Sequence, residues 1–310
     1  MKFSELSKKS ALAAIIAVAA IAAGSAWRLA RTHAGPADAA KAAVPRSGGP
    51  DSDFTRGYPE KAAAPDAGAA PPAGEFGRFY SDGKRQSGRF ALTFDDGPGT
   101  TTPELLELLR RNNARATFFM LGSAVRRYPK YAAAVAGAGH LLGNHTFTHA
   151  NFNKLPQPGR EAAMAAEICE TEAAVYAAAG QPPYFLRAPY GLSSQWIREL
   201  AAKKGYVLVN WSCGADWWFY PREQILKQYL DNLHSGAIFL LHDGGSSKRE
   251  TTVWLVERIL AEAKKRGLKP ARLDELLDID MRVLARERAK LSGCCSCGPE
   301  KRAGVLPAAL

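Results

Sequence analysis

The sequence predicts an α/β fold built around a parallel β-sheet. After residue 79, short apolar runs of strand length alternate with amphipathic segments of helical length, the pattern that repeated strand and helix units give. Glycine stands directly after four of the expected helices, where a left-handed cap is favoured (Gly139, Gly180, Gly205 and Gly267). Polar clusters follow the expected strands, and in a parallel sheet the carboxyl ends of the strands converge on one face.

The first 31 residues predict an export segment. Three lysines precede an uncharged stretch at residues 10–27, and two arginines follow it (Lys2, Lys8, Lys9, Arg28 and Arg31). The small residues at 24–26 suit cleavage of a signal peptide, while the uncharged stretch is near the length that spans a bilayer. A cleaved signal and an uncleaved anchor are both open. We expect a periplasmic or cell-envelope protein, with residues 10–27 as the candidate tether to the inner membrane.

Residues 32–79 predict a disordered linker, because Ala, Pro, Gly and scattered charges dominate them. Residues 80–278 carry the α/β pattern and are expected to form a single domain. Seven strands are expected there, at 89–94, 116–121, 140–144, 184–186, 206–211, 237–241 and 268–273. Six helices are expected between them, at 103–112, 129–138, 161–179, 195–204, 222–233 and 252–266. Periodicity does not choose between an open doubly wound sheet and a closed barrel.

Residues 279–310 are expected to form a basic C-terminal tail that contains cysteines. The chain has 5 cysteines, so at least one thiol is unpaired or paired with another chain. Cys294, Cys295 and Cys297 lie close together, but without a second pair or a nearby histidine they make a weak zinc signal. Incidental or redox-sensitive thiols are the favoured interpretation.

The composition indicates an anionic environment. The chain has 310 residues and a 46% hydrophobic content that is ordinary for a soluble globular protein. Its 41 basic against 30 acidic residues give a net charge of +11, which suits nucleic acid, a membrane surface or an acidic wall polymer. Nucleic acid is disfavoured, because zinc-finger spacing, a basic heptad helix and an aromatic RNA-binding signature are all absent from the sequence. No obligate protein partner is evident either.

The segment 93–98, TFDDGP, places Asp95 and Asp96 side by side at a strand end. Adjacent side chains diverge, so one carboxylate can bind a metal while the other acts as a base on a water molecule. A pair of helix-capping aspartates explains an isolated Asp-Asp-Gly equally well.

The segment 145–149, HTFTH, contains two histidines four residues apart, His145 and His149. On a helical turn both imidazoles would project to the same side, which suits one metal ion. The chain has 6 histidines and two of them fall here, directly after a strand, which favours ligands over surface histidines. Two histidines and one aspartate leave coordination positions open, as in catalytic sites. Zinc is expected, although the same donors accept cobalt, nickel or iron.

Three further segments can contribute to chemistry. In RAPYG, at 187–191, Arg187 can fix a carboxylate and the turn can aim a backbone N–H at an oxyanion, although a structural ion pair explains the segment better when it stands alone. In GADWW and FLLHD, at 214–218 and 239–243, Asp216 can pair with His242 to make a general acid. Trp217 offers a surface on which a sugar ring can stack. The alternatives are tryptophans packed in the core, which we favour for Trp218, and a His242 paired with Asp243.

Taken together and in this order, TFDDGP, HTFTH, RAPYG, DW and LLHD resemble the polysaccharide deacetylase family, which includes chitin, nodulation-factor and peptidoglycan deacetylases. The resemblance covers about residues 89–277. It implies a single catalytic domain with an incomplete or distorted (β/α)7 barrel, and a metal-dependent enzyme that removes N-acetyl groups from a sugar polymer.

The resemblance also implies a role for each candidate residue. These are the general base (Asp95), the residue that steers it (Arg187), the metal ligands (Asp96, His145 and His149), the oxyanion-hole N–H (Tyr190), the general acid (His242), its partner (Asp216) and a wall of the acetyl pocket (Leu241). The sequence departs from the family at Phe152, where leucine is frequent, and at 213–215, where CGA replaces commoner polar residues. The second departure bears on substrate specificity.

Export and a basic charge favour peptidoglycan N-acetylglucosamine as the substrate, ahead of chitin-type oligosaccharides. An amidase or an O-acetyl esterase with the same metal site is the enzymatic alternative. A wall protein that binds carbohydrate without catalysis is the other alternative, and the intact set of polar residues argues against it.

Overall fold

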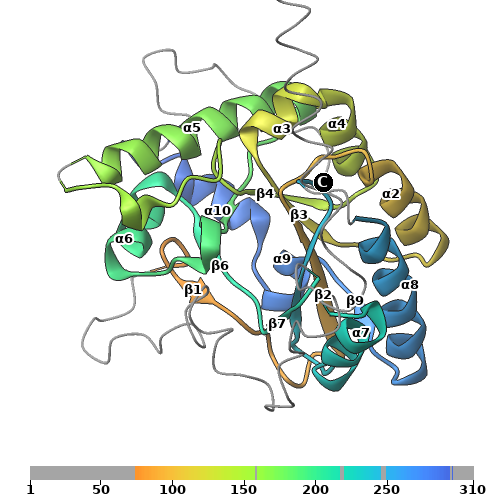
Figure 1. The fold of residues 1–310 in the computed structure, drawn as a ribbon. Helices are drawn as coiled ribbons and strands as arrows, with labels where there is room; N and C mark the ends of the chain where they lie inside the picture. Colours follow the sequence, from red (N-terminus) through yellow and green to blue (C-terminus); the bar gives the residue numbers. More distant parts are fainter. Residues whose placement is uncertain (1–73, 158, 217–219, 246–248, 294, 296–310) are drawn as a thin grey trace, which may run out of the picture. The chain divides into compact units, whose positions relative to one another are not determined.

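A curled sheet of parallel strands organises the part of the chain that the computed structural model describes, residues 74–157, 159–216, 220–245, 249–293 and 295 (Figure 1). These residues belong to the unit Asp53–Leu310, and the predicted export segment lies outside them. No described helix is both long and apolar enough to cross a membrane.

The strands run in the order β1-β6-β5-β4-β3-β2-β8-β7, with β9 also paired to β2, and every pairing is parallel. They are β1 (Phe79–Tyr80), β2 (Arg89–Asp95), β3 (Thr117–Met120), β4 (Leu141–Asn144), β5 (Phe185–Leu186), β6 (Val207–Val209), β7 (Cys213–Gly214), β8 (Ile238–His242) and β9 (Lys269–Pro270). Among the described strands, β1 and β7 end the sheet without pairing to each other. The architecture is therefore an incomplete α/β barrel, as predicted.

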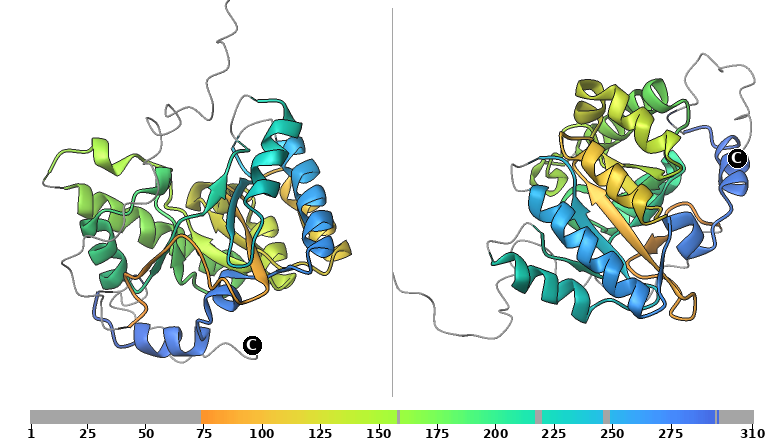
Figure 2. Two further views of the ribbon diagram at one scale, coloured as in Figure 1. Left: turned by 90° about the horizontal axis from the view of Figure 1, so that it is seen from below. Right: turned by 90° about the vertical axis from the view of Figure 1, so that its right-hand side faces the viewer.

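Helices flank the sheet. They are α2 (Thr102–Arg111), α3 (Gly122–Arg127), α4 (Pro129–Gly137), α5 (Arg160–Ala179), α6 (Gln195–Lys204), α7 (Arg222–Asp231), α8 (Arg249–Lys265), α9 (Leu273–Leu277) and α10 (Met281–Arg288). Figure 2 shows α2, α7 and α8 side by side on one flank. All seven predicted strands and all six predicted helices are present; β1, β7, α3, α9 and α10 were not predicted. The last predicted strand is too long, because the chain enters α9 at Leu273.

Alternation along β2 separates two cores. Phe90, Leu92 and Phe94 pack outward under the helices, whereas Ala91 points into the barrel with the leucines of α9. Successive side chains of a strand point to opposite faces, so Thr93 and Asp95 also point inward. The leucines of α9 contact residues near the start of the strands and fill the amino-terminal end of the barrel. The polar inward residues are left at the carboxyl-terminal end.

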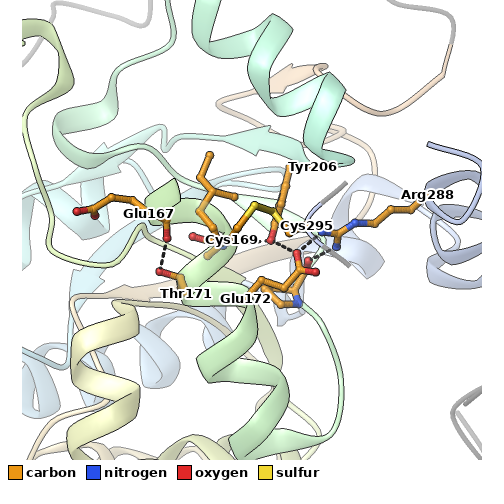
Figure 3. The surroundings of a disulfide bond; sticks show 10 residues. Glu167, Cys169, Thr171, Glu172, Tyr206, Arg288 and Cys295 are labelled. Carbon is orange, nitrogen blue, oxygen red and sulfur yellow. Dashed lines mark hydrogen bonds and ion pairs between the residues drawn. A yellow bond between two sulfur atoms is a disulfide. The ribbon is translucent and has the colours of Figure 1, made fainter. Parts of the chain in front are cut away.

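The chain continues to pack on the domain beyond residue 278, where the predicted tail begins. Leu284 and Arg288 of α10 are buried, and a disulfide joins Cys295 to Cys169 of α5 (Figure 3). Cys213 is a buried free thiol whose pKa burial raises to about 12. Cys294 and Cys297 lie outside the described residues.

Candidate active site

The predicted polar clusters meet at the carboxyl ends of the strands. Asp95 ends β2, His145 follows β4, Arg187 follows β5 and His242 ends β8. Asp95 and His242 are register partners across β2 and β8, so they lie side by side on the same face of the sheet. The predicted convergence at one edge of the sheet is confirmed.

Asp96, His145 and His149 form a potential metal site. One ligand atom from each of them lies within 4.8 Å of the others, and Asp96 Oδ1 is 3.7 Å from Nε2 of both histidines. Among the described residues, Asp96 Oδ1 is buried without a hydrogen-bond partner. A buried carboxylate oxygen that lacks a partner is costly, and a cation bound between these three side chains would remove that cost. The donor set therefore fits a divalent metal ion.

Hydrogen bonding prepares His145 to be a ligand. Its Nδ1 lies 2.7 Å from the carbonyl oxygen of Arg187. A carbonyl only accepts, so Nδ1 carries the proton and Nε2 presents its lone pair towards the site, where oxygens of Asp95 and Asp96 lie 3.5 and 3.7 Å away. Burial lowers the pKa of His145 to about 3, although Asp96 opposes this shift. The ring is therefore neutral, as a metal-binding imidazole must be.

The segment that carries both histidines is not the helical turn that four-residue spacing suggested. Residues 145–149 form a loop in which Thr146 and His149 are left-handed, with φ of 67° and 62°. This conformation is rare for residues other than glycine and rarer still for a β-branched threonine. The two rings converge without a helical turn, with centroids 5.0 Å apart.

Two side chains from neighbouring elements hold this loop. Asn144 Oδ1 accepts a hydrogen bond of 2.9 Å from the N–H of Thr146. Glu167 of α5 accepts from the N–H groups of Phe147 and Thr148, at 2.9 and 2.7 Å. The loop conformation is thus imposed by one local hydrogen bond from Asn144 and by tertiary hydrogen bonds from Glu167, which together offset the strain at Thr146.

Asp95 is buried beside a buried guanidinium. Arg187 Nη1 donates to Asp95 Oδ1 at 2.8 Å and to Thr93 Oγ1 at 2.7 Å. Arg187 also donates to the carbonyl oxygens of Val209 and Asn210, so its position is fixed from several directions. Burial raises the pKa of Asp95, and the charge of Arg187 opposes that increase. The result is a fixed carboxylate that can accept a proton.

His242 is paired with Asp216, as predicted. Asp216 Oδ1 lies 2.7 Å from His242 Nδ1, and Asp216 Oδ2 accepts from the N–H of His242 at 2.8 Å and from Thr252 at 3.0 Å. Burial lowers the pKa of His242, but the charge and hydrogen bond of Asp216 outweigh it, so the pKa is raised overall. This pairing favours the protonated imidazole that a general acid requires.

Asp243 does not satisfy His242, so that alternative is wrong. Its Oδ2 instead accepts from Thr102 Oγ1 at 2.5 Å, behind the turn that follows Asp96. Gly97 is needed there, since a Cβ atom would meet the Asp243 carboxylate at 2.2 Å. Burial raises the pKa of Asp243 to about 7.

The remaining candidates differ in outcome. Tyr190 is left-handed, with φ of 61°, and its ring lies against that of His149 at 4.8 Å. Trp217 and Trp218 lie outside the described residues. Leu241 belongs to the outer core and faces away from His242, so the expectation that it lines an acetyl pocket was wrong. Leu240, two residues from His242, shares its face.

Sequence reasoning missed several residues of the site. Period-two alternation along β8 was a sufficient signal for Leu240. Thr93, Glu167 and Asn210 offered no comparable signal, because their roles depend on partners far away in the sequence. Asn210, for example, donates to the carbonyl oxygen of Gly191 at 2.8 Å and so holds the turn that contains Tyr190. Asn144 has one local partner, Thr146, but its other partners, Ile168 and Tyr206, are also distant.

Comparison with known proteins agrees with this geometry. The family model described as polysaccharide deacetylase matches residues 82–209. A peptidoglycan-N-acetylglucosamine deacetylase of Bacillus cereus is 37% identical over 191 residues, which span 60% of this chain and 87% of that protein. A chitooligosaccharide deacetylase of Bradyrhizobium sp. is 31% identical over 198 residues, spanning 60% and 89%. A solved peptidoglycan N-acetylglucosamine deacetylase has a TM-score of 0.61 at 28% identity and covers 65% of this chain and 94% of its own.

Proposed function

This chain belongs to the polysaccharide deacetylase family, and from that premise we propose that it removes N-acetyl groups from peptidoglycan N-acetylglucosamine outside the cytoplasm. The reaction hydrolyses a linear amide and releases acetate and a free amine. We further propose that a divalent metal ion, zinc in the first place, is held by Asp96, His145 and His149.

One observation carries the proposal. A buried base, a possible metal site and a partly exposed acid lie at the same edge of the sheet, and each has its own partner. Arg187 holds Asp95, the Arg187 carbonyl orients His145, and Asp216 holds His242. A structural ion pair would not require all three arrangements at one edge.

The metal ion, when bound, supplies a Lewis acid that stabilises negative charge on the acetyl carbonyl oxygen. Asp96 contributes the unpaired oxygen, and the two histidines contribute neutral nitrogen atoms. Tyr190 contributes a backbone N–H that can stabilise the same charge, and Asn210 holds the turn that aims it.

The proton transfers fall to Asp95 and His242. Asp95 accepts a proton from water as the water oxygen attacks the acetyl carbon. When the carbon–nitrogen bond breaks, His242 donates the proton on Nε2 to the leaving nitrogen, since Nδ1 is engaged by Asp216. Arg187 favours the ionised form of Asp95 against the effect of burial and holds the carboxylate in position before the attack.

Peptidoglycan is the proposed polymer because of charge and predicted export. The relatives act on peptidoglycan or on chitooligosaccharides, so they do not choose between the two. A net charge of +11 suits an anionic wall better than a neutral glycan. The predicted segment at 10–27 supports a place in the periplasm or cell envelope, either free or tethered to the inner membrane.

A substrate panel tests the proposal. The purified chain, supplied with zinc, is incubated with peptidoglycan, chitooligosaccharides and O-acetylated xylan, and acetate is measured. We expect the highest kcat/KM on peptidoglycan and none in the Asp95→Asn variant. A higher kcat/KM on chitooligosaccharides would overturn the proposal that peptidoglycan is the substrate. A higher kcat/KM on the O-acetyl ester would support the esterase alternative instead.

A further inference from the structure

A chain of buried polar side chains links the C-terminal segment to the metal-binding loop. Arg288, at the end of α10, donates to Glu172 Oε2 of α5 (Figure 3). Tyr206 donates its hydroxyl proton to the same oxygen at 2.5 Å. Asn144, directly before His145, donates from Nδ2 to the Tyr206 hydroxyl at 3.1 Å. Side chains from α10, α5, β4 and the residue before β6 therefore meet behind the loop.

We call the series Arg288, Glu172, Tyr206 and Asn144 the relay, and the direction of each hydrogen bond in it is fixed. Asn144 Nδ2 also donates to the carbonyl oxygen of Ile168, and Asn144 Oδ1 accepts from the N–H of Thr146. These two partners cannot exchange roles, so the amide has one orientation. Tyr206 must then accept from Asn144 and donate to Glu172.

All four side chains are removed from solvent. Tyr206 and Asn144 are 0% exposed, and Glu172 and Arg288 are 4% exposed. Arg288 also donates to the carbonyl oxygen of Pro183 at 2.9 Å. A buried carboxylate requires its partners, because an unpaired charge in the interior is strongly unfavourable. The position of Tyr206 thus depends on a residue that lies beyond the predicted catalytic domain.

The relay ends where the loop is most strained. Asn144 Oδ1 binds the N–H of Thr146, and Thr146 is the left-handed residue between the two histidines. A change in the tilt of the Asn144 amide would therefore alter the loop that presents both imidazoles.

We propose that Tyr206, held by Glu172 and Arg288, is a positioning residue for the metal-binding loop, and that the C-terminal segment is consequently part of the site's support. This inference rests on the proposed metal-binding role of His145 and His149. It requires no contact between Tyr206 and the substrate.

The disulfide strengthens the same link. Cys169 lies on α5 three residues before Glu172, so the two side chains share a face of that helix (Figure 3). Its bond to Cys295 holds the chain that follows α10 against α5. The segment that supplies Arg288 is thereby joined to the helix that supplies Glu172.

Metal affinity of the Tyr206→Phe variant tests the proposal. The substitution removes one hydroxyl and leaves the Glu172–Arg288 pair in place. We expect metal affinity to fall by up to about tenfold, the lower end of the loss seen when a direct hydrogen-bond partner of a metal ligand is removed, because Tyr206 acts through Asn144. At saturating metal, kcat should return to the wild-type value. Tyr80→Phe is the matched control: it loses a bond to Glu75 at 2.6 Å, away from this relay, and should bind metal as the wild type does.

Arg288 is tested through a double-mutant cycle. Arg288→Gln should weaken metal binding in the wild-type background and add nothing in the Tyr206→Phe background, because both act through one hydroxyl. Arg288→Lys, which keeps the charge, should restore affinity. If Arg288→Gln does not fold, the Tyr206→Phe comparison still decides.

Unchanged metal affinity in a folded Tyr206→Phe protein would overturn the inference. So would an equal loss of affinity in Tyr80→Phe. Failure of the proposed function is a different result, since the wild-type chain itself would then bind no metal or release no acetate.

Discussion

At the residue scale, strained backbone conformations are concentrated in the candidate active site. Six non-glycine residues of the described chain have positive φ, and four belong to the site (Asp96, Thr146, His149 and Tyr190). Such conformations persist only where surrounding contacts impose them. In TFDDGP, HTFTH and RAPYG the backbone therefore adopts strained conformations that direct the side chains into the site, at a cost in local stability.

The His242–Asp216 pair predicts a pH effect. In the proposed mechanism His242 is the general acid and acts in its protonated form, so kcat/KM should fall as pH rises through the His242 pKa. Asp216 raises that pKa against the effect of burial. Asp216→Asn keeps the size of the side chain and removes the charge, so the alkaline limb of the profile should move to lower pH.

Asp243→Asn is the control for this shift. Asp243 is a neighbouring buried carboxylate that binds Thr102 rather than His242. Its substitution should leave the alkaline limb in place even if the rate falls. An alkaline limb that does not move in Asp216→Asn would remove His242 from the role of acid.

At the element scale, the sequence predicts elements better than the loops between them. The pattern of β2 is readable because Phe90, Leu92 and Phe94 alternate with inward residues. The conformation of the HTFTH loop cannot be predicted from its own sequence, because hydrogen bonds to Asn144 and Glu167 determine it rather than local helical preference. The two-residue strands β1 and β7 are too short for any periodicity to show.

The Cys169–Cys295 disulfide closes a loop of sequence separation 126. Cross-links of this kind stabilise mainly by restricting the unfolded chain, and we expect Cys169→Ser to lower the free energy of unfolding by about 2–4 kcal/mol. Urea denaturation with and without reductant measures this. Reductant should bring the wild type down to the variant and leave the variant unchanged. A wild type that reductant does not affect would show that the bond is absent or contributes nothing.

At the scale of the whole molecule, the two ends of the barrel differ: one is closed by apolar side chains and the other carries the polar residues of the candidate site. Leu273, Leu276 and Leu277 of α9 fill the amino-terminal end, and the polar residues occupy the other. The sequence predicts the polar end, because the carboxyl ends of parallel strands converge and polar residues follow them. It does not predict the closed end, since the apolar run near Leu273 is equally compatible with a longer strand. It also gives no sign that Arg288 reaches back to Glu172.

We propose that one metal ion, held by Asp96, His145 and His149, is required for deacetylation. The most direct test strips the metal with a chelator, returns zinc stepwise and measures acetate released from peptidoglycan. We predict that activity rises until one equivalent per chain is bound, that His149→Ala does not recover at that level, and that Asp95→Asn binds zinc without releasing acetate. Acetate release that is the same before and after the metal is removed would contradict the account.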